Sequence, residues 1–121
     1  MIWTHSGWQG ENMFQLNLRL RAQPHKVDKA IQALRSIVIA TQAERGLLAS
    51  RIYQEAGNPE MLCLEEDWSS EPVLQSYLRS SCFTDLLMLM ETAPEAPILE
   101  VHFVGKVHGL EYVEAVRFGE K

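Results

Sequence analysis

Residues 13 to 22, MFQLNLRLRA, alternate strictly between apolar and polar side chains. Successive side chains of a strand point to opposite faces, so this pattern predicts a strand with one apolar and one polar face. The apolar members are Phe14, Leu16, Leu18 and Leu20, and the polar ones are Gln15, Asn17, Arg19 and Arg21. A sheet built on such a strand must cover its apolar side and leave the polar side to water or to another molecule.

A helix is predicted after this strand, over residues 25 to 46. Its apolar residues Val27, Ala30, Ile31, Leu34 and Val38 recur at the three-and-four spacing of one helix face, and Thr41 continues that spacing. Gly46 is expected to end this helix, because glycine readily adopts the left-handed conformation found at helix C-termini.

Three further strands are predicted, over residues 47–56, 60–68 and 98–104. The first two are joined by a turn at 57–59, GNP, and therefore form a hairpin. After residue 104 the pattern is ambiguous, and LEYVEAVRF, residues 110–118, is compatible with a fifth strand or a terminal helix.

A second helical region follows the third strand. Ser69 or Ser70 can cap it, and Glu71 favours the positive end of a helix. It runs through 73–80 and re-forms over 82–92. The resulting order, β-α-β-β-α-β, predicts a ferredoxin-like α+β fold with a four-stranded antiparallel sheet and helices on one face.

A length of 121 residues suits one compact domain. We expect an irregular N-terminal arm over 1–12, the folded domain over 13–104, and a C-terminal extension over 105–121 that contributes to a dimer interface. A chain this small that encloses a ligand pocket often completes it by self-association, which favours a homodimer.

The charge pattern excludes some partners. Eleven basic residues stand against sixteen acidic ones, and no run of basic residues occurs, so nucleic acid is not an expected partner. No stretch is apolar for long enough to span a bilayer, and the first residues lack the pattern of a signal peptide, so we expect a cytoplasmic protein without a membrane partner.

Cys63 and Cys82 are expected to be reduced packing residues, and the histidines lack metal-ligand spacing, so no metal site is predicted.

The uncovered face of the sheet is the candidate site. Asn17 and Arg19 lie there, and Glu100 and His102 join them if the apolar residues of the last strand meet the helices. The second strand stays ambiguous, because neither the side with Arg51 and Tyr53 nor the side with Ser50 and Ile52 is clearly apolar. Closed against a second copy, this face would form a chamber with polar groups inside, which is typical of a small-molecule site. The alternative is a solvated face with ordinary surface charges.

Several segments together resemble the antibiotic biosynthesis monooxygenase (ABM) domain: ERG at 44–46, LLASRIYQEA at 47–56, the GNP turn, the strand that ends in Trp68, SSEP at 69–72 and YLRSSCF at 77–83. The resemblance covers roughly residues 13 to 104. It implies a dimeric α+β barrel and, as in many members, oxygenation of a small phenol or quinol by O₂ without metal or flavin. Such chemistry needs a site that binds the aromatic molecule, removes its proton and excludes water.

The resemblance also suggests residue roles. Trp68 matches the family tryptophan at the end of the third strand, where it would wall the chamber and direct its indole N–H to a substrate oxygen; alternatively it is a wedge that anchors the second helix. Asn17 matches a first-strand asparagine of haem-degrading members and would hydrogen-bond a ligand or oxygen. His102 is the candidate base, since histidine titrates near neutral pH, or else an exposed strand residue. Arg19 or Arg51 would stabilise a developing anion.

The second helix departs from the family. Tyr77 and Cys82 stand at its two histidine positions, and Leu87 stands where haem-degrading members carry the axial histidine, so haem cleavage is disfavoured. Tyr77 and Cys82, with Tyr53, are expected to contact substrate.

The expected function is a cofactor-independent ABM-type monooxygenase acting on a small quinol-like aromatic. A non-catalytic dimeric binding or sensing module is the alternative, and an isomerase or decarboxylase on the same scaffold is a third.

Overall fold

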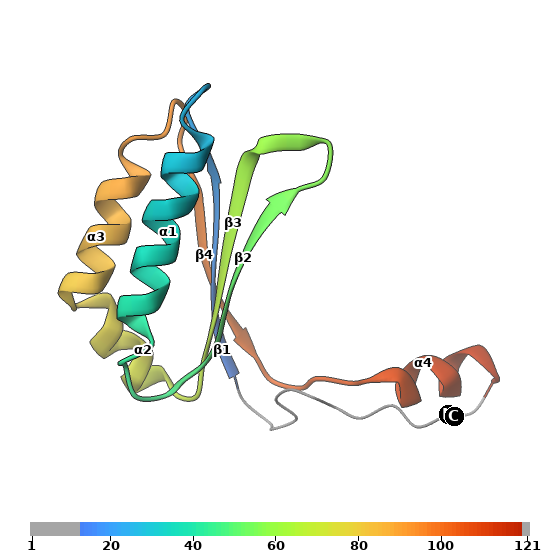
Figure 1. Cartoon of the computed structure of the whole chain (residues 1–121). Coiled ribbons are helices and arrows are strands. Elements are labelled where there is room, and N and C mark those ends of the chain that lie inside the picture. The colour runs from blue at the N-terminus through green and yellow to red at the C-terminus, as the bar shows by residue number, and fades with distance from the viewer. Residues whose placement is uncertain (1–12, 120–121) are drawn as a thin grey trace.

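A computed structural model describes residues 13–119 and shows a two-layer α+β domain with a projecting C-terminal helix (Figure 1). In chain order the elements are β1 (Met13–Arg21), α1 (Val27–Thr41), β2 (Leu47–Glu55), β3 (Asn58–Trp68), α2 (Glu71–Leu78), α3 (Ser81–Met90), β4 (Ile98–Val104) and α4 (Leu110–Arg117). The predicted ferredoxin-like order is confirmed. None of the helices within 13–119 is long and apolar enough to cross a membrane.

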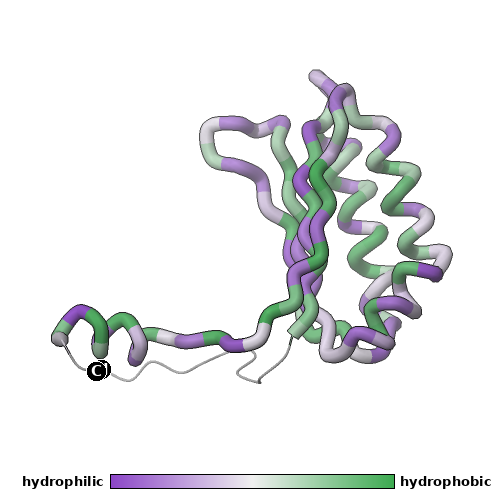
Figure 2. The backbone as a smooth tube through the Cα atoms, turned by 180° about the vertical axis from the view of Figure 1, so that it is seen from behind, coloured by the Kyte–Doolittle hydropathy of each residue, from purple (hydrophilic) through white to green (hydrophobic). Residues whose placement is uncertain are grey.

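The four strands form one antiparallel sheet in the order β2-β3-β1-β4. Helices α1, α2 and α3 all lie on one side of it (Figure 1), which we call the covered face; the other side is the free face. Figure 2 shows the alternation of hydrophilic and hydrophobic residues along the strands that separates the two faces. The apolar set of β1 forms the centre of the core, with Leu16, Leu18 and Leu20 at most 2% exposed.

The first helix is shorter than predicted. It ends at Thr41, whose hydroxyl donates to the Ile37 carbonyl at 2.7 Å, and a turn then leads to β2. Gly46 does adopt the left-handed conformation, with φ of 84°, but it lies at the entry to β2. A Cβ at this position would come within 2.6 Å of Val73 Cγ1, so glycine is needed where the loop packs against α2.

The β2–β3 hairpin turns one or two residues earlier than predicted. Glu55 pairs with Asn58, which leaves Ala56 and Gly57 as a two-residue turn and places Asn58 and Pro59 in β3. Gly57 has φ of 80°, as tight hairpin turns commonly require. Of the three residues of GNP, only the glycine lies in the turn.

Serine caps start both helices of the second helical region. Ser70 Oγ accepts from the Val73 amide at 3.3 Å, and Ser80 Oγ accepts from the Phe83 amide at 3.3 Å. The Ser80 cap explains why the region divides into α2 and α3, because its extended backbone interrupts the helix.

The segment after β4 forms a helix and not a fifth strand. Helix α4 has no buried residue and stands clear of the sheet, on the side opposite α1–α3, in both views (Figures 1 and 2). The tip of the β2–β3 hairpin bends toward that same side. The predicted N-terminal arm, 1–12, lies outside the described residues.

Candidate functional site

The strand register gathers the predicted polar residues on the free face in three cross-strand rows. Each row takes one residue from each of β2, β3, β1 and β4: Ala49–Asp67–Gln15–His102, Arg51–Glu65–Asn17–Glu100 and Tyr53–Cys63–Arg19–Ile98. The ambiguity of the second strand is thereby resolved, because Arg51 and Tyr53 share a face with Asn17 and Arg19. Ile52 packs against the core on the covered face.

An open pocket of about 340 Å³ lies over the middle of this face. Its lining comes from the central strands β1 and β3 and from the edge strand β4: Asn17, Leu18, Arg19, Cys63, Leu64, Glu65, Ile98 and Glu100. Apolar and polar groups therefore converge in one concave site, as small-molecule pockets require.

His102 is held between Glu100 and Asn17. Glu100 Oε1 lies 2.9 Å from His102 Nε2, and Asn17 Nδ2 lies 3.4 Å from His102 Nδ1. A carboxylate can only accept, so the neutral imidazole carries its hydrogen on Nε2 and keeps its lone pair on Nδ1. The Nδ1 atom is therefore the nitrogen that can take up a proton, and its contact with Asn17 is long enough to be exchanged for one with a ligand.

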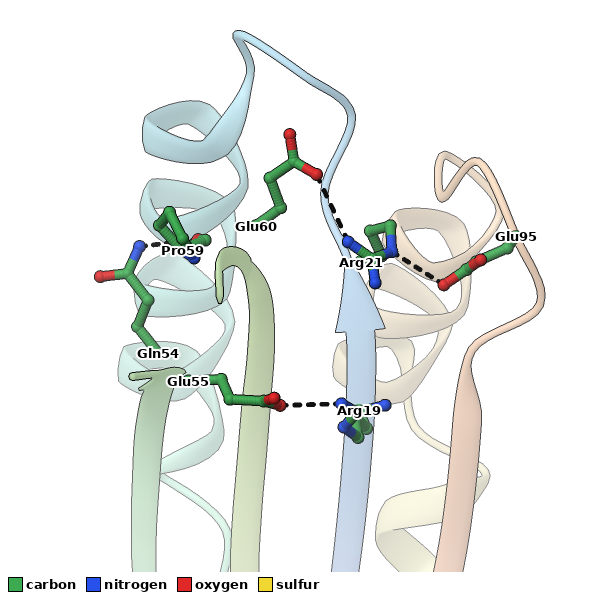
Figure 3. Close-up of polar contacts among 7 residues, drawn as sticks. All are labelled: Arg19, Arg21, Gln54, Glu55, Pro59, Glu60 and Glu95. Atoms are coloured by element: carbon green, nitrogen blue, oxygen red, sulfur yellow. Dashed lines mark hydrogen bonds and ion pairs between the residues drawn. The ribbon is translucent and has the colours of Figure 1, made fainter. Parts of the chain in front are cut away.

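The two arginines nearest the middle of the free face are already ion-paired. Arg19 Nη2 contacts Glu55 Oε2 at 2.8 Å (Figure 3), and Arg51 contacts Asp67 at 2.8 Å and Glu65 at 3.3 Å. Their positive charges are thus partly neutralised by the protein's own carboxylates.

At the end of the strands, Arg21 bridges Glu60 and Glu95 at 3.4 and 2.9 Å, and Gln54 donates to the Pro59 carbonyl at 2.7 Å (Figure 3). Ion pairs this exposed contribute little stability. We assign them to the strand ends and not to the site.

Trp68 does not line the free face, so its expected place in the chamber wall is wrong. In β3 the residues with odd numbers face the free side and the even ones face the helices, which places Trp68 in the core at 0% exposure. Its ring stacks on Tyr77 with centroids 4.6 Å apart. This is the position of the alternative interpretation, in which Trp68 anchors the second helix to the sheet.

The helix residues expected to contact substrate also lie away from the free face. Tyr77 is buried under α2, and burial raises the pKa of its phenol above the ordinary value, so it stays protonated. Cys82 packs partly buried against the core. Of the two cysteines, both of them unbridged, it is Cys63 that lines the pocket, where burial raises the pKa of its thiol.

Sequence reasoning missed a buried acid on the covered face. Glu66 is 0% exposed, and its Oε2 accepts from the Tyr77 hydroxyl at 3.1 Å. Burial raises the pKa of Glu66 to about 7, against smaller opposing effects of Tyr77 and Trp68. The signal was available: Glu66 occupies the same phase of β3 as Leu62, Leu64 and Trp68.

Sequence reasoning also gave no role to Gln15, Glu65 and Asp67, which lie in the same rows as Asn17 and His102. Within residues 13–119, no three side chains of histidine, cysteine, aspartate or glutamate gather as metal ligands would.

Comparison with solved structures shows the same fold. A conserved protein from Methanosarcina mazei Go1 is 25% identical with a TM-score of 0.70, covering 76% of this chain and 92% of that one. A protein from Deinococcus radiodurans described as a "putative antibiotic biosynthesis monooxygenase" is 16% identical with a TM-score of 0.71, covering 79% and 96%. A protein of the same description from Bordetella bronchiseptica is 17% identical with a TM-score of 0.64, covering 75% and 95%. No protein of curated function matches the chain.

The family model described as antibiotic biosynthesis monooxygenase matches residues 13–87, which span β1 through most of α3. This range contains β1, β2, β3, α1 and α2 in full, and most of α3. The chain therefore belongs to the antibiotic biosynthesis monooxygenase family.

Proposed function

We propose that this protein is a monooxygenase that oxidises a small quinol-like aromatic with O₂ and without metal or flavin. The observation that carries the proposal is the Glu100–His102 pair beside the pocket of the free face. Family membership supports the general type of activity. The expected roles of Trp68, Tyr77 and Cys82 are not part of the proposal.

In this mechanism His102 Nδ1 takes the proton of a substrate hydroxyl. Glu100 accepts the Nε2–H, fixes the tautomer and stabilises the imidazolium that forms. The deprotonated, electron-rich ring then passes electrons to O₂. One oxygen atom forms a new C–O bond to the ring, the other leaves as water with two hydrogens of the quinol, and the product is a hydroxyquinone.

Closure of the site is proposed to come from a second copy of the chain. A second sheet laid over the free face would cover the open pocket and exclude bulk water from it. The hairpin tip and α4 both project on the free side, where a second copy would lie between them. Exclusion of water by this contact would protect the reactive intermediate.

Steady O₂ uptake with a panel of reduced quinols tests the proposal. His102→Ala should lower kcat by about a hundredfold or more, the usual loss when a general base is removed. His25→Asn is the matched control, since His25 is an exposed loop residue with φ of 66° that asparagine tolerates. A rate that is unchanged by His102→Ala would contradict the assignment of the base.

A binding or sensing module on the same barrel is the second candidate, favoured by the ion pairs that already engage Arg19 and Arg51. A ligand that raises the melting temperature without any O₂ uptake would support it. An isomerase or decarboxylase could use the same base, and its products would be identical with and without O₂.

A further inference from the structure

Asp67 fixes the orientation of two amide side chains on the free face. Its carboxylate can only accept, so Gln15 turns its Nε2 to Asp67 Oδ1 at 2.8 Å. Gln15 Oε1 is then left to accept from Asn17 Nδ2, at 3.1 Å. Arg51 holds Asp67 in place from the other side at 2.8 Å.

The relay leaves an acceptor at the centre of the face. With its amide nitrogen engaged, Asn17 has only Oδ1 remaining, and this atom is buried with no hydrogen-bond partner among the described residues. A buried acceptor without a donor costs free energy, which a donor from a ligand can recover. Asn17 also lines the pocket, so a ligand there lies next to this side chain.

The charges around Asn17 also favour a hydroxyl donor over an anion. Around the pocket, four carboxylates outnumber two arginines, and each of these arginines is ion-paired with at least one of them. The carboxylates are Glu55, Glu65, Asp67 and Glu100, and the arginines are Arg19 and Arg51. A ligand anion would meet net negative charge, whereas a hydroxyl donor would meet acceptors.

We infer that the pocket selects an uncharged aromatic diol, one hydroxyl of which donates to Asn17 Oδ1, and rejects aromatic ligands that carry a carboxylate or other anionic group. The choice of an aromatic ligand rests on the proposed function; the preference for donors over anions rests on the relay and the carboxylates. This selection differs from the expectation that Arg19 or Arg51 would bind an anion.

The test compares a naphthohydroquinone with its ring-carboxylated analogue, by calorimetry under argon at low salt. We expect the dissociation constant of the uncharged diol to be lower than that of the carboxylated analogue by about tenfold or more. Repulsion between like charges a few ångströms apart near a protein surface is strong enough to weaken binding by at least about that factor. Raising the salt concentration should narrow the difference in affinity between the two ligands, because salt screens the repulsion of the anionic group.

Two variants locate the effect. Asn17→Ala should weaken binding of the uncharged diol about tenfold. Glu65→Gln should narrow the difference in affinity between the two ligands, because it removes one negative charge. Glu91→Gln is the control, because it removes the same charge from an exposed position at the end of α3, behind the covered face, and should leave the difference intact. Circular dichroism verifies that each variant is folded.

Equal or tighter binding of the carboxylated analogue, or no binding of either ligand, would overturn the inference. Because no O₂ is present, diol binding without later turnover in air would leave the inference standing and refute the monooxygenase proposal. Turnover that prefers the carboxylated quinol would refute the inference and leave the monooxygenase proposal standing.

Discussion

Glu66 lies between the sheet and the helices, and the structure gives its carboxyl group a hydrogen bond from Tyr77 but no cation partner among the described residues. Its Oε1 and the Trp68 indole N–H are both buried without hydrogen-bond geometry to any described partner. The raised pKa, about 7 against an ordinary 4.5, means that the folded protein binds the Glu66 proton more tightly than the unfolded chain does. Folding is therefore favoured by the neutral carboxyl group.

The sign and the size of the effect follow by linkage. The contribution is fully present below pH 4.5 and is lost as the pH rises through about 7. At 1.36 kcal/mol for each pH unit, the whole difference corresponds to about 3 kcal/mol, of which about 2 to 3 kcal/mol is lost between pH 5 and pH 8. Glu66→Gln keeps the shape of the side chain and abolishes its titration, so the variant should lack this loss.

Urea denaturation followed by circular dichroism at several pH values, at constant salt and protein concentration, measures both proteins. The difference in unfolding free energy between wild type and Glu66→Gln isolates Glu66 from the other titrating groups. Glu91→Gln, the same change at an exposed carboxylate, should track the wild type. If the wild type gains stability relative to Glu66→Gln between pH 5 and pH 8, or shows no change, the buried neutral carboxyl group is refuted.

Other predictions concern the glycines and the buried hydroxyl. Gly46→Ala should cost about 2 kcal/mol or more, because it combines φ of 84° with a clash against Val73, whereas Gly57→Ala, with φ of 80° and no neighbour within 4 Å, should cost about 1 kcal/mol; equal losses in denaturation would refute the clash. Tyr77→Phe removes the donor to Glu66, so it should raise the pKa of that carboxyl further and cost about 1 to 3 kcal/mol at pH 8, and an unchanged pH profile would contradict the hydrogen bond.

Much of the fold could be predicted because its signals are local. The alternation in 13–22 gives the two faces of β1, and the spacing in 27–41 gives the apolar face of α1. Strand β4 matches its predicted range, and the cap at Ser70 is one of the two serines proposed. Helix ends were less predictable, since the chain from residue 42 to 46 turns where the loop meets α2, which is a contact between distant segments.

The candidate site was predictable by face but not by contact. Asn17 and His102 could be placed on one side of the sheet from their phase along β1 and β4. Of the two expected roles of Trp68, the structure matches the helix anchor, because Trp68 shares the apolar phase of Leu62 and Leu64 in β3 and is buried under the helices. A place in the chamber wall would have needed the opposite phase.

By itself, the sequence determined which side chains β1 turns to the helices and which it leaves free, because that choice depends on backbone periodicity and its apolar and polar residues alternate strictly. The tertiary structure decided the rest. The strand register placed Arg19 and Arg51 next to the carboxylates with which they form ion pairs. The packing of α2 against the sheet buried Glu66 next to Tyr77. Residues 110–117 pair with no described strand and form a helix, which satisfies its own backbone hydrogen bonds.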